Sequence, residues 1–137
     1  IDFQLDLLCS QPDLLQDYML RSSILHMDLT IENLRAIFDA YRRGDEAALT
    51  ELVLPDVEDT DLEELPEEEA EELNRMSEAY YHQMYTERNI AMAQCAEQLL
   101  EEGKRVFYVV GVAHMLGDGG IVNLLREAGY SVTQIVY

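Results

Sequence analysis

Basic residues are scarce in this chain of 137 residues, which has 9 Lys and Arg against 28 Asp and Glu and a formal net charge of −19. Such a charge repels phosphate backbones, so nucleic acid is excluded as a partner unless the few basic residues form a local patch. They are scattered instead, and the adjacent pairs are Arg42–Arg43 and Lys104–Arg105. We therefore expect no nucleic-acid binding.

Cysteine is also rare, and the two that occur, Cys9 and Cys95, exclude a disulfide framework. Each lies among apolar residues at helical spacing, which favours two buried free thiols. A single bridge between them is the alternative.

Long hydrophobic runs are absent. No apolar stretch approaches the roughly 20 residues that a membrane-spanning helix needs, so we expect no membrane span in this segment. HExxH, CxxC, P-loop and GxSxG motifs are absent too, which excludes the commonest signals of zinc peptidases, redox proteins, nucleotide-binding proteins and serine hydrolases. The chain begins with Ile1 inside an amphipathic pattern, and we expect it to be a piece of a longer polypeptide.

The chain divides by composition into three parts, which we interpret as one segment, 1–137. Residues 1–54 predict short helices, with Gly44 ending one of them and Asp45 capping the next. Between positions 56 and 72 stand eleven acids and no base, and we interpret 55–72 as a solvated, variable loop. The alternative is a site for calcium or a basic partner, but an EF-hand loop would need a central Gly. Residues 73–137 predict a long helix followed by a strand, a helix and a strand.

The long helix is expected from about Glu67 to Glu102. One stripe of residues at spacings of three and four predicts its buried face: Met76, Tyr80, Met84, Glu87, Ala91, Cys95 and Leu99. Glu87 is the exception in this stripe, because a buried carboxylate is costly unless it meets a cation, a metal or hydrogen-bond donors. Periodicity alone favours a structural salt bridge over a functional role.

The last third predicts a small sheet. Val106–Val110 is a continuous β-branched and aromatic run of the kind that is covered on both faces in a parallel sheet. A turn at 111–117, a helix from about Asp118 to Ala128 and a final strand at 132–136 would complete a right-handed crossover. The expected fold class is therefore α/β, mostly helical with a small parallel sheet, as part of a larger α/β fold.

His114 follows the first predicted strand, at the edge where open parallel sheets bind ligands. Imidazole transfers protons near neutral pH and is a frequent metal ligand. The alternative is a histidine that only caps the turn, and position alone does not separate the two.

These residues occur in a family pattern. Gly111-Val112-Ala113-His114 and the glycines that follow it resemble the C-terminal GxxH signature of the TraB/GumN family, which includes the Tiki proteins. Glu87-Arg88-Asn89 resembles that family's Glu-Arg-Asn helix, and Arg43-Gly44-Asp45 resembles its Gly-Asp turn. The order and spacing of these elements make the combination specific.

The resemblance implies that this is the C-terminal portion of a family member. Family members carry two GxxH motifs and this chain has one, so an N-terminal half would be missing and the chain would be inactive alone. The parent would be a metal-dependent hydrolase or protease using manganese or cobalt. In it, His114 would be a metal ligand or general base and Glu87 a ligand or acid–base partner, while Arg88 would stabilise an oxyanion and Asn89 would orient the substrate.

The partners implied are a peptide or protein substrate and either a second copy, giving a dimer, or the missing half. Family resemblance favours a secreted, periplasmic or envelope-associated protein. The alternative function belongs to another class: a non-catalytic binding or regulatory module that captures a peptide or basic partner.

Overall fold

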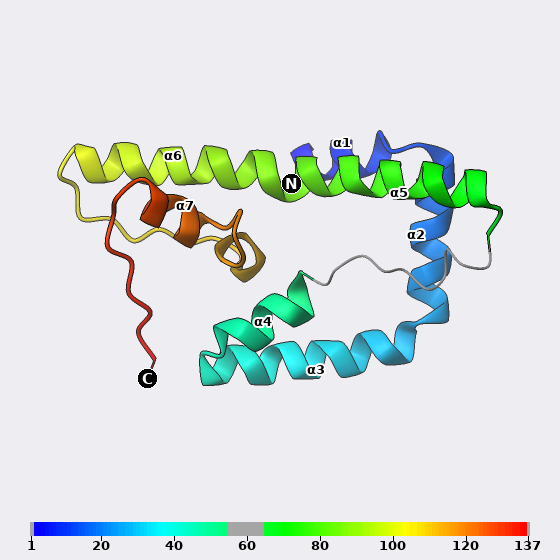
Figure 1. Ribbon diagram of the computed structural model, residues 1–137, viewed down its shortest axis with the longest axis horizontal. Coiled ribbons are helices and arrows are strands. Elements are labelled where there is room, and N and C mark those ends of the chain that lie inside the picture. Colours follow the sequence, from blue (N-terminus) through cyan, green and yellow to red (C-terminus); the bar gives the residue numbers. More distant parts are fainter. Residues whose placement is uncertain (1, 55–64, 137) are drawn as a thin grey trace.

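The structure, a computed structural model, describes residues 2–54 and 65–136. Most of the predicted acidic loop, 55–72, therefore lies outside the described residues. Within them the chain is built from helices and connecting coil (Figure 1), in the order α1 (Asp2–Cys9), α2 (Asp13–Leu25), α3 (Met27–Arg43), α4 (Glu46–Val53), α5 (Glu67–Tyr81), η2 (His82–Thr86), α6 (Glu87–Glu101), η3 (Val112–Met115) and α7 (Ile121–Glu127).

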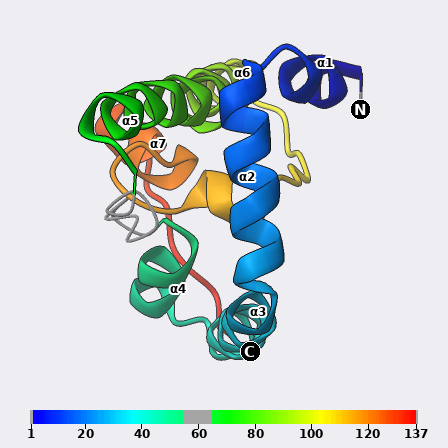
Figure 2. The ribbon, with the colours of Figure 1, turned by 90° about the vertical axis from the view of Figure 1, so that its right-hand side faces the viewer.

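One long rod dominates the architecture. Helices α5 and α6 follow each other along one side of the molecule, joined by η2, while α3 runs along the opposite side with α4 packed on it. Helix α2 crosses between the two sides, and α7 with the turn before it lies beside α6 (Figure 2). The turn that contains His114 is thus placed between the rod and the α3–α4 pair.

The predicted boundary between α3 and α4 is confirmed. Gly44 ends α3 with a φ of 66°, a left-handed conformation that glycine adopts without a Cβ penalty. The Asp45 side chain then accepts a hydrogen bond of 3.1 Å from the Ala48 backbone N–H, which caps the free donors at the start of α4.

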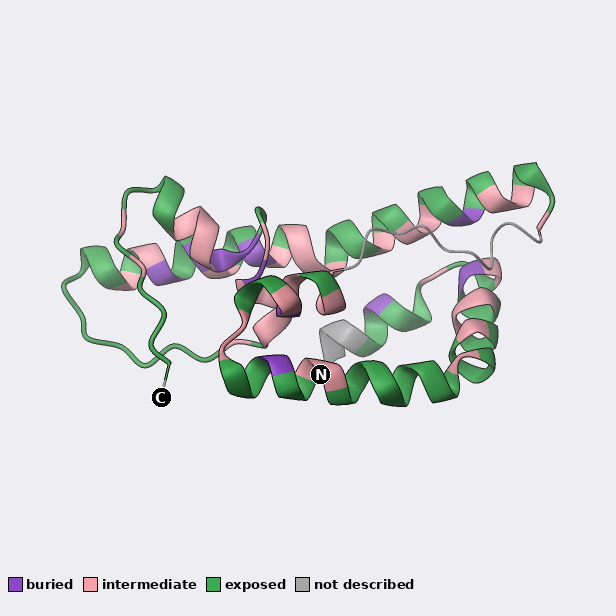
Figure 3. Ribbon diagram, turned by 60° about the horizontal axis from the view of Figure 1, so that its bottom comes forward, coloured by how far each residue is buried: buried purple, intermediate pink, exposed green. Residues whose placement is uncertain are grey.

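Buried side chains form small local clusters rather than one large core. Leu15 of α2 and Leu73 of α5 are each 1% exposed. A second cluster joins Ala40 of α3, Leu49 of α4 and Leu116, which follows η3. Figure 3 shows further buried positions where α6 lies against the turn and α7. Leu116 therefore anchors the His114 turn to the α3–α4 pair.

The predicted parallel sheet is wrong: no residue of the described ranges is in a strand. Segments 104–111 and 130–136 run as coil, and Phe107, Val109 and Ile135 are 95%, 73% and 71% exposed. Each segment is instead tied to a helix by a side chain. The Tyr108 hydroxyl donates to the Met92 carbonyl at 3.2 Å, and Gln134 Nε2 donates to the Gly44 carbonyl at 2.8 Å.

The physical reason is that strand preference is a property of context. β-branched and aromatic side chains favour a pleated, half-buried surface, but a strand also needs a neighbour to pair with its backbone groups. A unit of two strands is marginal without further strands or a covering layer. In the described part of the chain the two segments do not pair with each other, so the α/β assignment is corrected to all-helical.

The prediction of buried thiols is also wrong. Cys9 and Cys95 are free, as favoured, but both are exposed. In α6 the buried positions are instead Asn89, Ala93 and Ala96, one to two residues beyond the predicted stripe.

Gly120 is required by a close backbone approach, which gives a first prediction. A Cβ at this position would clash with the Leu116 carbonyl oxygen, and that oxygen cannot rotate away as a side chain can. We expect Gly120→Ala to lower the free energy of unfolding by about 1–3 kcal/mol, the usual cost of overpacking, measured by chemical denaturation. Gly119→Ala is the matched control, because no atom lies within 4 Å of its Cβ. Equal loss in both variants would contradict this account.

Candidate functional site

His114 lies in η3, a single turn of 3₁₀ helix that begins directly after Gly111. Its backbone N–H donates to the Gly111 carbonyl at 3.0 Å, which closes the turn. The side chain is half-buried. Leu116, two residues later, holds the turn on the α3–α4 side, while the imidazole faces α6.

Asn89 of α6 meets this imidazole. Its side chain is 4% exposed and is the buried polar group among the described residues. Asn89 Nδ2 donates to the Gly119 carbonyl at 2.8 Å, and Asn89 Oδ1 lies 2.7 Å from His114 Nδ1. Both ends of the amide are therefore paired, as a buried amide requires to offset its desolvation.

The two contacts together assign the tautomer of His114. Because the Gly119 carbonyl can only accept, the Asn89 atom facing it must be the NH₂ group, and Asn89 Oδ1 must face the imidazole. An amide oxygen only accepts, so His114 Nδ1 carries the proton and donates. In the neutral ring the lone pair is then on Nε2, which is the atom that can accept a proton or bind a metal.

The surroundings of His114 favour its neutral form. Burial lowers the pKa of His114 from its ordinary value of 6.5, and the positive charge of Arg88 lowers it further. Arg88 is half-buried on α6, where its Nη1 donates to the Met84 carbonyl at 3.4 Å. The sequence prediction thus named three residues that the structure brings together: His114, Asn89 and Arg88.

Tyr85 was missed by the sequence prediction. Its ring lies 5.4 Å from the His114 ring, centroid to centroid, at an angle of 45°. The Tyr81 ring in turn lies 4.8 Å from the Tyr85 ring, centroid to centroid, at an angle of 31°. Tyr85 lies within the π turn His82–Thr86, which interrupts the α-helical spacing, so periodicity alone does not single it out.

Glu87 does not lie in the buried stripe in which periodicity placed it. Its side chain is 64% exposed, and Glu87 Oε1 lies 3.5 Å from Nδ1 of His82, within the same rod. Periodicity favoured a structural salt bridge for Glu87 without naming its partner, and the exposure of this contact with His82 makes its contribution to stability small. A role for Glu87 as metal ligand or acid–base partner of His114 stays a prediction.

The described residues do not offer the donors that a metal site needs. A catalytic metal is typically held by three protein ligands with one open position. Within residues 2–54 and 65–136, no three His, Cys, Asp or Glu side chains are grouped so that they would hold a metal ion. His114 and Glu87, the predicted ligands, do not complete such a set with any described residue.

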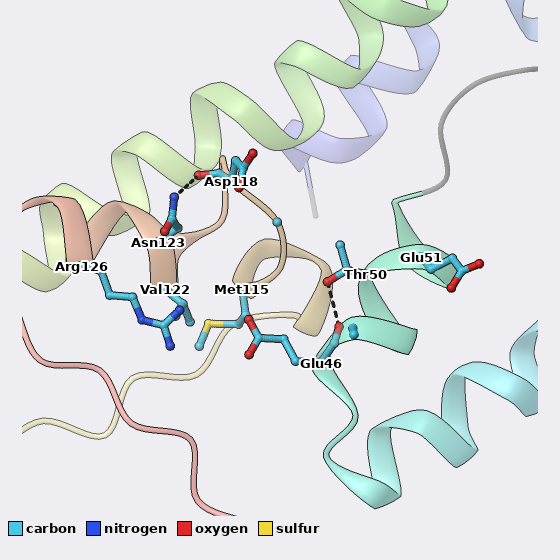
Figure 4. A pocket seen from close by; sticks show the side chains of 10 residues that line it. Glu46, Thr50, Glu51, Met115, Asp118, Val122, Asn123 and Arg126 are labelled. Atoms are coloured by element: carbon cyan, nitrogen blue, oxygen red, sulfur yellow. Dashed lines mark hydrogen bonds between the residues drawn. The ribbon is translucent and has the colours of Figure 1, made fainter.

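An open cleft of about 680 Å³ lies beside the His114 turn, between α4 and α7. Met115, Gly117 and Asp118, which follow His114 directly, form part of its wall. Figure 4 shows Glu46 of α4 and Arg126 of α7 reaching toward the opening from opposite walls, with Met115 between them. The cleft thus combines an apolar centre with charged groups at its edge.

Comparison with known proteins decides the family. The sequence matches the profile of the TraB/PrgY/gumN family over residues 1–134. The chain belongs to the TraB/PrgY/gumN family. The GxxH turn with His114 and the helix with Arg88 and Asn89, which the structure joins, are the elements whose resemblance predicted this membership.

A protein of Amphimedon queenslandica named "Metalloprotease TIKI homolog" is similar to this TraB/PrgY/gumN chain, with 29% identity over 101 residues. The match covers 71% of the chain and 20% of the sponge protein, so the chain spans about a fifth of the length of that relative. No solved structure matches. In the described ranges no helix is both long and apolar enough to cross a bilayer.

The lowered pKa of His114 gives a second prediction. NMR titration should give a value below 6.5, because burial and the Arg88 charge both disfavour the imidazolium. The unfolded chain then binds a proton at His114 more readily than the folded chain does. Neutral His114 therefore contributes fully to the free energy of unfolding above about pH 6.5, and this contribution is lost as the pH falls below 6.5 through the lowered pKa of the folded state.

Replacing Arg88 by Gln removes one of the two causes and should raise the pKa of His114. Arg75→Gln is the matched control, since it removes the same charge from an exposed position on the same rod, where Arg75 pairs with Glu72. An unchanged pKa in the Arg88→Gln variant would show that Arg88 does not act on this ring.

Proposed function

We propose that this chain supplies the proton-accepting part of a hydrolase active site that cleaves peptide bonds. The observation that carries the proposal is the hydrogen bond between Asn89 Oδ1 and His114 Nδ1, which leaves Nε2 as the basic atom of a neutral imidazole. Family membership and the name of the TIKI relative support a hydrolase.

In the proposed reaction, His114 Nε2 accepts a proton from a water molecule as the water oxygen bonds to the substrate's carbonyl carbon. The carbonyl oxygen becomes an oxyanion, which the Arg88 guanidinium stabilises through its charge. When the C–N bond breaks, the imidazolium returns the proton to the leaving amine. Asn89 acts through His114, because it fixes the tautomer that makes Nε2 the acceptor.

A divalent metal is the cofactor that the relative's name suggests, and manganese or cobalt is the prediction from family resemblance. The described residues do not fit such an ion by themselves, since they offer no group of three donors. Among the described residues His114 Nε2 is the atom that we propose as a ligand, and further ligands would come from other residues of the parent protein or from another chain. No step proposed above depends on the metal.

The cleft beside the turn is the proposed binding place for the substrate. Ala47, Met115 and Val122 give it apolar surface, and Glu46 and Arg126 give it polar groups at the edge. Ligand sites commonly combine apolar lining with a few polar groups that fix orientation. A peptide segment bound there would lie beside the turn that carries His114, whose imidazole faces α6 and is not part of the cleft wall.

Peptide cleavage tests the proposal, in the natural polypeptide that carries this sequence. We expect His114→Ala to lower kcat/KM for an unstructured peptide by about 10²–10⁴-fold, the usual contribution of a general base. Assays with EDTA, Mn²⁺ and Co²⁺ would establish the metal requirement. Activity is followed by mass spectrometry of the products.

His26→Ala is the control, because it removes a histidine at the junction of α2 and α3, away from the Asn89–His114 pair. Undiminished cleavage by the His114→Ala variant would rule out the proposed role. Binding of the peptide without cleavage by the intact protein would instead favour the second class of function, a module that captures a peptide or basic partner.

A further inference from the structure

The helix that carries the site contains one irregular turn. Residues His82–Thr86 form a π turn between α5 and α6, and the Glu87 backbone N–H donates to the His82 carbonyl, five residues back. An α-helical bond reaches four residues back, so a π turn takes in one residue more than an α turn. Single π turns inside α-helices are rare and occur frequently at functional sites.

The extra residue changes which side of α6 faces the molecule. In an uninterrupted α-helix of about 100° per residue, Asn89 would lie about 160° around the axis from the buried Leu73. When one residue is taken up by the π turn, this angle falls to about 60°. The buried face of α5 can thus continue into Asn89, Ala93 and Ala96 of α6.

The same shift turns Glu87 outward. A continuous α-helix puts Glu87 in one stripe with Met84, Ala91 and Cys95, but in the structure Glu87 and Cys95 are exposed. Glu87 then pairs with His82 at the other end of the π turn. Because of the π turn, the amide of Asn89 lies in the buried face of α6 and the carboxylate of Glu87 does not.

Tyr85 lies inside the π turn, and its ring meets the imidazole of His114 at 5.4 Å. This separation is within the range in which tilted aromatic rings attract each other. Tyr81 packs against Tyr85 at 4.8 Å, ring centroid to ring centroid. The imidazole is thus restrained by two groups of the rod: Asn89 at its Nδ1 edge and Tyr85 at its ring.

We propose that the π turn His82–Thr86 makes Tyr85 a positioning residue for His114. Tyr85 holds the imidazole in the orientation in which its Nδ1–H donates a hydrogen bond to Asn89 Oδ1. The importance of this positioning for catalysis rests on the proposed function of His114 as proton acceptor. The orientation and tautomer of the His114 ring can be measured without any assay of activity, so the positioning role can be tested by itself.

The test uses NMR of the chain with ¹⁵N-labelled histidine, in which the His114 signals are identified by their loss in a His114→Ala variant. In the wild-type chain we expect the Nδ1–H tautomer. Tyr85→Leu should shift the ring toward a mixture with the Nε2–H tautomer. Exchange of the Nδ1 proton with solvent should become about two- to tenfold faster, the factor that corresponds to one lost aromatic contact.

Tyr85→Phe should keep both wild-type signatures, the Nδ1–H tautomer and the slow exchange of the Nδ1 proton, because it retains the ring and removes only the hydroxyl. Tyr80→Leu is a control that removes a half-buried tyrosine from the adjacent part of the same rod, and it should leave both signatures unchanged. Wild-type tautomer and exchange rate in the Tyr85→Leu variant would overturn the proposal.

A second pair of variants tests the turn itself. Gln83 is an exposed member of the π turn, and deleting it should restore α-helical spacing and rotate Asn89 away from His114. The Nδ1–H signature should then be lost, whereas Gln83→Ala, which keeps the length, should retain it. A folded deletion variant that keeps the signature would contradict the role of the turn. If the deletion prevents folding, the Tyr85 variants decide.

These readouts separate the inference from the proposed function. If Tyr85→Leu changes the tautomer while His114→Ala leaves peptide cleavage intact, Tyr85 positions the ring but the ring is not the proton acceptor. If His114→Ala abolishes cleavage while Tyr85→Leu leaves the tautomer unchanged, the catalytic proposal stands and the positioning role fails.

Discussion

The site depends on the pairing of one buried amide. Asn89 is almost fully removed from solvent, and an amide in that position costs free energy unless both of its ends are hydrogen-bonded. Its partners are the carbonyl of Gly119 and the ring of His114, thirty and twenty-five residues further along the chain. The requirement to satisfy this amide therefore fixes where the C-terminal turn lies against α6. It also fixes which nitrogen of His114 is protonated.

Much of the site was predictable from the sequence, and its geometry was not. The GxxH turn and the Glu-Arg-Asn helix carry the family resemblance, and it groups His114 with Glu87, Arg88 and Asn89, of which Glu87 is exposed and lies against His82. The orientation of α6 depends on a single inserted residue at 82–86. A period of 3.6 residues extended across that turn assigns Glu87 and Cys95 to the buried face, and both are exposed. The error comes from the one residue that the π turn takes up, and it propagates along the whole of α6.

The fold shows a different limit. Helix ends at Gly44 and Asp45 were predicted correctly because capping depends on residues that are adjacent in the chain. The sheet was predicted wrongly because strand pairing depends on a neighbouring backbone that a run such as Val106–Val110 does not specify. In the described residues this run is tied to α6 through the Tyr108 hydroxyl instead. Local signals were therefore reliable where the interaction is local.

Leu116 connects the chemistry of the turn to the stability of distant helices. It is 6% exposed and packs with Ala40 and Leu49, while Asn89 holds the other side of the same turn. A segment clamped between two packing units is ordered only while both are intact, since local opening of either one removes a constraint. Fluctuations of the α3–α4 pair would thus reach His114 without any change in α6. The lifetime of the ordered imidazole is then set by whichever of the two clamps opens more often.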